Sequence, residues 1–237
     1  MSFEDKIKQI NDAISELSLI NAFQYIIKEA EGALVFSTSF GQEDQVITDL
    51  IFSNDLNIDV FTLDTGRLFP ETYEVFHKTI NKYQKPIKTY APDTVQLEQL
   101  ITEKGPNSFY NSLEERKECC HIRKIEPLKR ALRGKRMWVT GLRAGQSENR
   151  SATPLLEWDA NFEILKFNPL INWSLEAVQT YLDEHSVPQN SLHKKGFISI
   201  GCQPCTRAIE PGEDLRAGRW WWESSKKECG LHSTNKK

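Results

Sequence analysis

The stretch ALVFSTSFGQEDQVITDLIF, residues 33–52, decides the fold class of this chain. It opens with a run that predicts a buried strand over 33–39, and it continues as a helix from about Asp44 to Phe52. Strand-like runs recur along the chain with helical segments between them, at 58–64, 86–92 and 136–142. This alternation predicts an α/β fold with a doubly wound, mostly parallel sheet. Ligands of such sheets bind at the carboxyl ends of the strands, so chemistry is expected there.

Helical signals surround these strands. Pro70 suits the first turn of a helix, and Ser174 is a candidate N-cap for a helix over 173–185. Near the N-terminus, apolar residues recur at helical spacing: Ile7, Ile10, Ile14 and Leu17. We expect one α/β domain over residues 1–223, followed by a mobile tail over 224–237 that is polar and lacks periodicity.

The composition restricts the class of protein. The 237 residues include 39% hydrophobic residues and carry a formal charge of −3, so the chain can bury a sizeable core. A slightly acidic chain has no general basic field for nucleic acid or an anionic membrane. The first residues lack a basic region followed by an apolar run, and no apolar stretch approaches the ~18 residues of a membrane span. We expect a soluble cytoplasmic protein, with its oligomeric state left open.

The turn after the first strand carries hydroxyl groups. Ser37, Thr38 and Ser39 supply donors, and Gly41 allows close backbone approach, next to a helix N-terminus that favours anions. The Gly-Lys-Ser/Thr ending of a Walker A loop is absent. An ordinary capped turn is the alternative, but its position favours phosphate or sulfate binding.

Two further loops follow predicted strands. Asp64 and Gly66 follow the second strand, where Gly66 would permit close backbone approach. Arg143 and Arg150 follow the fourth strand, and each can present two donors to a phosphate or sulfate group. Each loop alone could be an ordinary surface turn. Together at one edge of a sheet they favour a nucleotide pocket.

Five cysteines provide the sharpest signal. Without a secretory signal, metal binding or catalysis is a better interpretation than a disulfide framework. Four of them form two pairs, Cys119–Cys120 and Cys202–Cys205. Structural zinc is one candidate, but adjacent side chains on a helix diverge by about 100° and suit a single ion poorly. A four-thiolate iron–sulfur cluster tolerates divergent ligands better and is favoured.

Basic residues surround the first cysteine pair: Arg116, Lys117, Arg123 and Lys124. They could balance the charge of a cluster or hold an anionic substrate, and the alternative is a solvated helix face. Cys229 stands apart, and the nearby Lys226, Lys227 and His232 would favour its nucleophilic thiolate. An incidental tail cysteine is the alternative. Arg216 and Arg219 add two more candidate anion ligands upstream.

Six segments together resemble the assimilatory adenylyl-sulfate reductases of the APS/PAPS reductase family: STSFGQED, LDTGRLFPET, KECCHIRKIEPL, TGLRAGQSENR, GCQPCTRAIEPGEDLRAGRWWWE and ECGLH. The resemblance covers residues 35–232. It implies an adenine nucleotide α-hydrolase-like fold, a [4Fe–4S] cluster on Cys119, Cys120, Cys202 and Cys205, and a nucleophile at Cys229 with His232 close by. It further implies that Lys124 lies between cluster and substrate. The other residues implied to bind the substrate are Ser37, Thr38, Ser39, Gly41, Leu63, Asp64, Gly66, Arg143, Arg150, Arg216 and Arg219.

The function that this resemblance implies is thioredoxin-dependent reduction of adenosine 5′-phosphosulfate (APS) to sulfite and AMP, through an enzyme S-sulfocysteine, in sulfate assimilation. Members with the full cysteine set typically use APS, and those without it use the 3′-phosphorylated form, PAPS; some cluster-bearing members accept both. PAPS reduction therefore stays open. Nucleotide-activating sulfur transfer would require an SGGxDS-like loop, from which STSFGQED departs. A zinc-stabilised nucleic-acid-binding module is a distant alternative, disfavoured by the charge of −3.

Overall fold

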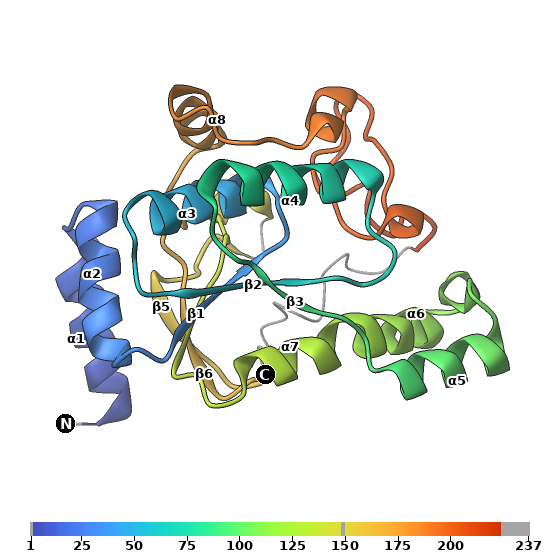
Figure 1. The fold of residues 1–237 in the computed structure, drawn as a ribbon, viewed down its shortest axis with the longest axis horizontal. Helices are drawn as coiled ribbons and strands as arrows, with labels where there is room; N and C mark the ends of the chain where they lie inside the picture. The colour runs from blue at the N-terminus through green and yellow to red at the C-terminus, as the bar shows by residue number, and fades with distance from the viewer. Residues whose placement is uncertain (1, 148–149, 224–237) are drawn as a thin grey trace. The chain divides into compact units, whose positions relative to one another are not determined.

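A computed structural model describes residues 2–147 and 150–223 of the chain, drawn as a ribbon in Figure 1. Its contacts divide the chain into two compact units, which are described separately below. Unit 1 comprises Met1–Phe61, Glu74–Lys88 and Gly134–Asn190, and unit 2 comprises Thr62–Tyr73, Thr89–Arg133 and Ser191–Lys237. The predicted division at residue 223 involves a segment outside the described residues, so it stays a prediction.

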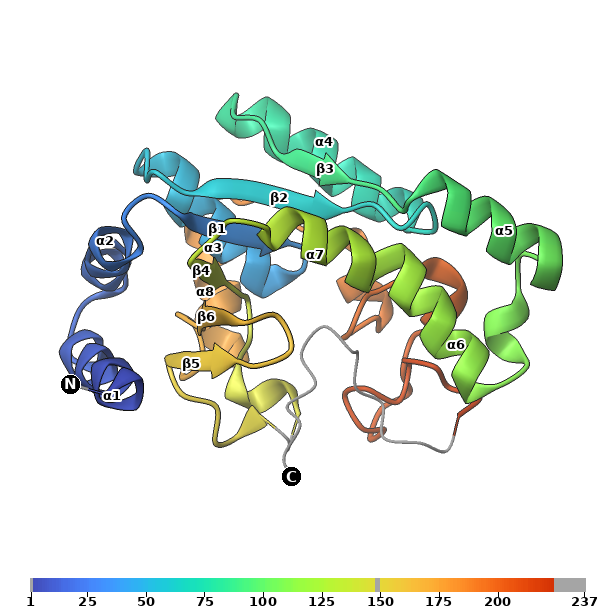
Figure 2. The ribbon, with the colours of Figure 1, turned by 90° about the horizontal axis from the view of Figure 1, so that it is seen from below.

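Unit 1 begins with two helices that lie side by side in both ribbon views (Figures 1 and 2), α1 (Phe3–Ser15) and α2 (Leu19–Ala30). A reciprocal capping box between Ser2 and Asp5 starts α1. Its predicted apolar stripe is confirmed at Ile10 and Ile14, which are buried. Leu17 lies beyond the end of α1 and is 39% exposed, so its assignment to that stripe was wrong.

The sheet has the strand order β3-β2-β1-β4-β6-β5. β1 pairs parallel with β4, β4 pairs parallel with β6, and only β5 is antiparallel to its neighbour among the pairs described within unit 1. The prediction of a mostly parallel α/β sheet is therefore confirmed. The strands are β1 (Leu34–Thr38), β2 (Asp59–Leu63), β3 (Lys88–Tyr90), β4 (Met137–Val139), β5 (Leu156–Asp159) and β6 (Ile164–Phe167).

Three further helices were expected from the sequence, namely α3 (Gln42–Ser53), α4 (Pro70–Tyr83) and α8 (Leu175–Glu184). Pro70 is the first residue of α4, where its missing N–H costs nothing. The Ser174 side chain caps α8 by accepting a hydrogen bond from the Ala177 backbone N–H. In unit 1, α3 packs against α8, and the buried face of α3 contributes Val46, Ile47 and Ile51 to the main core.

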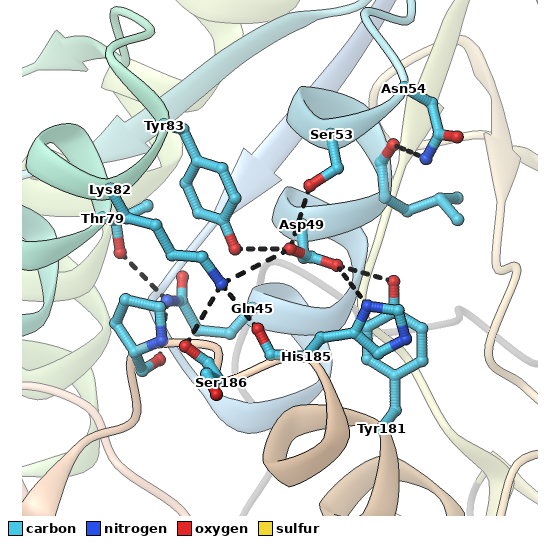
Figure 3. A network of polar contacts seen from close by, with 12 residues as sticks. Gln45, Asp49, Ser53, Asn54, Thr79, Lys82, Tyr83, Tyr181, His185 and Ser186 are labelled. Carbon is cyan, nitrogen blue, oxygen red and sulfur yellow. Dashed lines mark hydrogen bonds and ion pairs between the residues drawn. The ribbon is translucent and has the colours of Figure 1, made fainter.

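A buried carboxylate joins these helices (Figure 3). Asp49 of α3, 3% exposed, accepts hydrogen bonds from the hydroxyls of Tyr83 at 2.6 Å and Tyr181 at 2.8 Å. Lys82 Nζ lies 3.8 Å from the same carboxylate and donates to the His185 carbonyl at 2.7 Å. The network fixes the helix that follows the turn after β1, because α4 and the end of α8 both hold its second turn.

Unit 2 contains a helical rod and an irregular C-terminal segment. The rod consists of α6 (Leu113–Cys120), a π-helical turn η2 (His121–Ile125) and α7 (Glu126–Leu132), which run in one line in Figures 1 and 2. The helix α5 (Thr94–Lys104) precedes it. Short 3₁₀ turns occupy Ser108–Tyr110 and, in the C-terminal segment, Ser191–Lys195 and Gln203–Cys205; one more lies in unit 1 at Ala144–Gln146. Within residues 2–147 and 150–223, no helix is long and apolar enough to span a membrane.

Candidate active site

The turn between β1 and α3 in unit 1 is closed by its own carboxylate. Asp44 Oδ2 accepts hydrogen bonds from both the backbone N–H and the hydroxyl of Ser39, each at 2.6 Å. The Thr38 hydroxyl accepts from the Phe40 N–H at 3.1 Å, and Phe40 adopts a left-handed φ of 60°. These contacts order the turn at the carboxyl end of β1, and they already engage the N–H and hydroxyl donors of Ser39.

The other two residues predicted to bind the substrate from this loop, Ser37 and Gly41, lie at the two ends of the turn. Ser37, inside β1, accepts a hydrogen bond from the Trp138 indole at 2.8 Å. Gly41 is the N-cap of the twelve-residue α3 with an extended φ of −70°, and no side chain caps the helix there. The positive φ belongs to Phe40, so a special conformation of Gly41 is not needed. The uncapped first-turn amides and the helix dipole favour an anion at this position.

Asp44 is confined from a second direction by Gly141, in the loop after β4. A Cβ atom on Gly141 would lie 2.0 Å from Asp44 Oδ1, so only glycine permits this approach. Burial of the carboxylate raises the pKa of Asp44 to about 6, although the two Ser39 hydrogen bonds act in the opposite direction. The loops after β1 and β4 are thus interlocked in unit 1.

Arg143 lies in the same loop and is 7% exposed. Its Nε donates to Glu43 Oε1 at 3.1 Å, and its backbone N–H donates to Gln146 Oε1, also at 3.1 Å. Arg150 donates through Nη1 to the same Gln146 oxygen. Glu43 and Gln146 therefore hold two of the predicted anion ligands within unit 1.

The turn after β2 belongs to unit 2 from Thr62 onward. Leu63 ends the strand, and Asp64 Oδ1 accepts from the Gly66 N–H at 2.8 Å and from the Tyr73 hydroxyl at 2.7 Å. Gly66 has φ of 68°, which strains any residue with a side chain, and its Cα faces Arg123 Nη1. The positive φ explains a glycine at this position, but an added Cβ atom would lie 3.5 Å from Arg123 Nη1, an ordinary contact, so the expected close backbone approach stays a prediction.

The four predicted metal-binding cysteines come together on one cavity of unit 2. Cys119 and Cys120 end α6, and in the C-terminal segment Cys202 precedes a 3₁₀ turn that ends at Cys205. All four line a cavity of about 10 Å³, and three of them are buried. None is in a disulfide. The spacing of more than eighty residues between the pairs is closed by the fold, as the sequence predicted.

Three of the four basic residues around the first cysteine pair do not lie on a solvated helix face. Arg116, Arg123 and Lys124 are buried, at 4%, 5% and 9% exposure, and they line the same cavity. Arg123 and Lys124 each follow one cysteine of the first pair by four residues, a spacing that places side chains on the same face of a helix. Lys117, also in α6, is exposed and does not line the cavity, so the alternative of a solvated helix face holds for this residue.

Charge and burial affect the thiols in opposite directions. Burial alone would raise the pKa of Cys202, but Lys124, the Thr65 hydroxyl at 3.3 Å and two arginines outweigh it and lower that pKa. Burial, reinforced by repulsion from Cys202, raises the pKa of Cys205 to about 12. Nearby positive charge therefore dominates at Cys202, and burial dominates at Cys205.

The chemistry of this donor set fits an iron–sulfur cluster, which four thiolates hold. Two cavity-lining donors, Arg123 Nε and Trp220 Nε1, are buried and lack a hydrogen-bond partner among residues 2–147 and 150–223. Such donors would suit an acceptor inside the cavity. Over the same residues, no three His, Cys, Asp or Glu side chains are close enough to hold a single metal ion.

The remaining predicted site residues lie in the C-terminal segment. Arg219 is 6% exposed, contacts Ser199 and Ile200 through Nη1, and stacks over Trp220 at 4.8 Å. Arg216 is half-buried, and its N–H donates to Asp214 at 2.8 Å. Cys229 and His232 lie outside the described residues, so their roles stay predictions.

Several neighbours of the predicted residues were not foreseen as contributors. Glu43 and Asp44 belong to the STSFGQED motif, but their contacts are seen only in the folded structure. Glu43 holds Arg143, and Asp44 holds Ser39. Thr65 and Trp220 likewise reach the cysteine cavity from distant segments. An acidic pair at the start of a helix usually only complements its dipole, so the sequence carried no stronger signal for these roles.

Comparison with known proteins identifies the family to which the chain is similar. The model of the phosphoadenosine phosphosulfate reductase domain family matches residues 33–208. Proteins named adenosine 5′-phosphosulfate reductase are 47% identical in Sinorhizobium fredii, over 98% of this chain and 92% of the relative, and 48% identical in Allochromatium vinosum, over 92% and 85%.

Solved structures also resemble the chain. The crystal structure of a PAPS reductase from Candida auris in a phosphate complex has a TM-score of 0.75 at 29% identity, covering 88% of this chain and 98% of that one. An FMN adenylyltransferase from Candida glabrata shares the fold, with a TM-score of 0.55 at 16% identity over 91% of this chain and 79% of its own. Both the family match and the relatives span most of the sequence. The chain therefore belongs to the phosphoadenosine phosphosulfate reductase domain family.

Proposed function

We propose that this protein is an oxidoreductase that reduces APS to sulfite and AMP in sulfate assimilation. The relatives from Sinorhizobium fredii and Allochromatium vinosum carry the name of that activity, at 47% and 48% identity. The observation that carries the proposal is the gathering of four cysteines and three buried cations on one cavity of unit 2. That cysteine set is the feature that favours APS over PAPS.

The cavity is proposed to hold a [4Fe–4S] cluster on Cys119, Cys120, Cys202 and Cys205. When bound, the cluster would supply a compact centre of charge and a structural tie between the two cysteine pairs. Lys124 and Arg123 would balance the negative charge of the thiolates, since both are buried beside them. The proposal requires no change in the oxidation state of the cluster during turnover.

Substrate binding is proposed to use the anion-binding groups described in each unit. In unit 1, Ser37, Thr38 and Ser39, with the backbone at Gly41, face the phosphosulfate, and Arg143 and Arg150 neutralise it. In unit 2, the Leu63–Gly66 turn borders the nucleoside, and Arg216 and Arg219 supply further positive charge. These charges would stabilise the AMP phosphate as it leaves.

The reaction is proposed to begin with the Cys229 thiolate, with His232 close by. The thiolate attacks the sulfur of APS, the bond from sulfur to the phosphate oxygen breaks, and AMP leaves with that electron pair. A thiolate of an external dithiol then attacks Cys229 Sγ and releases sulfite. The second thiol of the dithiol resolves the mixed disulfide, so two electrons and two protons come from the reductant.

A dithiol protein of the thioredoxin type is proposed as that reductant. The chain has five cysteines, and four of them line the cavity, so Cys229 has no second thiol in its own chain for resolution. Such chemistry suits a reducing, cytoplasmic location, in which thiols stay reduced.

The test is anaerobic purification followed by a sulfite-release assay with thioredoxin, comparing APS with PAPS. We expect release from APS, and none from the Cys229→Ser variant. Preferential use of PAPS would replace the substrate assignment while leaving the reaction class intact. Full activity of Cys229→Ser would overturn the mechanism.

A further inference from the structure

A buried ion pair in unit 2 fixes the end of the C-terminal segment. Arg116 of α6 donates from Nε to Glu223 Oε1 at 2.8 Å and from Nη2 to Glu223 Oε2 at 2.9 Å. The two side chains are 5% and 9% exposed. The geometry is that of a bidentate pair, which fixes direction as well as distance.

The same arginine contacts the cysteine cavity. Its guanidinium lies over the Trp220 ring at 4.5 Å, and its side chain also hydrogen-bonds Cys120. Trp220 in turn donates its backbone N–H to the Cys205 carbonyl at 3.2 Å, and Glu223 donates its own to the Trp220 carbonyl at 2.9 Å. Arg116 therefore connects a residue of each cysteine pair with Glu223.

A purely stabilising role explains this pair poorly. Desolvating two charges costs about as much as their attraction returns, so a buried pair contributes little net stability. What a buried bidentate pair does provide is a single fixed orientation. Here the oriented residue is Glu223, and six residues later the sequence reaches Cys229.

We propose that Glu223 is a positioning residue for the reaction, held by Arg116 so that the chain continues toward Cys229 from a point set by the cysteine cavity. The proposal rests on the proposed function, in which Cys229 is the nucleophile. Six peptide units reach at most about 20 Å, so fixing Glu223 restricts where the nucleophile can go. The pair thereby couples the integrity of the cavity to delivery of the nucleophile.

The test compares Glu223→Gln with Glu213→Gln in the purified, cluster-loaded protein. Glu213 also forms a bidentate pair, with Arg207 at 2.8 Å for both contacts, but the two side chains are 32% and 37% exposed. For Glu223→Gln we expect kcat for sulfite release to fall about tenfold with the KM for APS within about twofold, because nucleophile delivery and not substrate binding is lost. Glu213→Gln should keep both values.

Hydrogen exchange provides a readout independent of activity. Amides of the peptide 217–223 should exchange about tenfold faster in Glu223→Gln than in the wild type or in Glu213→Gln, with iron content unchanged. Arg116→Lys should act in the same way, because an ammonium cannot make the bidentate contact. Unchanged kcat and unchanged exchange in Glu223→Gln would overturn the proposal, as would a parallel change in KM and kcat.

Failure of the proposed function is distinguishable from failure of this inference. A wild-type protein that releases no sulfite from APS would contradict the function, and the exchange comparison would still decide whether the pair fixes residues 217–223. If Glu223→Gln proves unstable, Arg116→Lys retains a positive charge in the cavity and gives the second comparison. Equal exchange in Arg116→Lys and the wild type would then overturn the inference.

Discussion

The Glu43 carboxylate holds Arg143 by its Nε atom, at 3.1 Å, from the first turn of α3. Both side chains are largely buried, at 15% and 8% exposure. The guanidinium also reaches the following 3₁₀ turn, because a Cβ atom on Gly145 would lie 2.7 Å from Arg143 Nη1. Glu43 therefore fixes the Nε edge of an arginine that is proposed to bind the anionic substrate.

Replacing Glu43 with glutamine should raise the KM for APS. The loss of one charge-assisted hydrogen bond, of roughly 1.5–3 kcal/mol, predicts an increase of about tenfold or more, with a smaller effect on kcat. Steady-state kinetics checks this. Glu31→Gln, which breaks the exposed pair with Arg136, is the control and should leave KM unchanged. An equal KM in Glu43→Gln and the control would refute the role of Glu43.

Asp44 should give stability a distinctive dependence on pH. Its pKa is raised from 3.8 to about 6, so the folded state binds the proton more tightly than the unfolded state. The contribution of Asp44 is therefore fully present below pH 3.8 and is lost as the pH rises through about 6. Denaturant unfolding of the wild type and Asp44→Asn should show their free-energy difference changing in this window and constant above it.

Asp5 provides a control of opposite sign for that measurement. Its hydrogen bonds with Ser2 lower its pKa, so its contribution is present at neutral pH and is lost as the pH falls through the acid range. The difference between the wild type and Asp5→Asn should therefore change in the opposite direction. Equal pH profiles for the two variants would contradict the assignment at Asp44.

The network around Asp49 predicts sensitivity to alkali. Burial, and next the hydrogen bond to Asp49, raise the pKa of both Tyr83 and Tyr181. Their contribution is fully present below about pH 10, the ordinary tyrosine pKa, and is lost as the pH rises above it. Unfolding followed between pH 8 and 11 should show stability falling less steeply in Tyr83→Phe than in the wild type.

The same variant should be less stable at neutral pH, because Asp49 loses one hydrogen bond in a buried site. The expected cost is roughly 1–3 kcal/mol in the free energy of unfolding. Tyr25→Phe in α2, outside the network drawn in Figure 3, is the matched control. If the free energy of unfolding of Tyr83→Phe equals that of Tyr25→Phe at neutral pH and at alkaline pH, the Tyr83 hydroxyl does not support Asp49.

The arrangement of the cysteines predicts that iron content and sulfite release respond to different substitutions. Cys120→Ser and Cys205→Ser should lose iron, sulfide and visible absorbance, because each removes one of the four thiolate ligands proposed for the cluster. Cys229→Ser should keep all three but release no sulfite. Iron and sulfide analysis of anaerobically purified protein checks this. Colourless wild-type protein with one zinc per chain would be incompatible with the cluster.

Much of the fold could be predicted because strand and helix periods were clear. The runs at 33–39 and 58–64 became β1 and β2 within two residues of their predicted ends. In contrast, β5 and β6 were missed, since each has only four residues and is joined to the other by a tight turn. β6 depends on pairing with β4, which lies far away in the sequence, and β5 depends on β6, so the local sequence gives little signal for either strand.

The site was predictable where residue type alone restricts the chemistry. Four cysteines in two pairs have few alternative uses, and the fold brings them to one cavity. The roles of Glu43 and Glu223 were not predictable, because a glutamate in a polar segment is usually solvated. Their partners, Arg143 and Arg116, lie about a hundred residues away, and only the folded structure joins them.

The π-helical turn at His121–Ile125 has a consequence for how this rod tolerates change. A π turn accommodates one more residue than an α turn, and each residue of a regular helix rotates the chain by about 100°. Deleting a single residue within this turn would restore regular winding and leave the later side chains of α7 close to their present azimuth. A deletion within α6 or α7 would instead rotate those side chains by about 100°, so the rod tolerates a change of length at the π turn better than on either side of it.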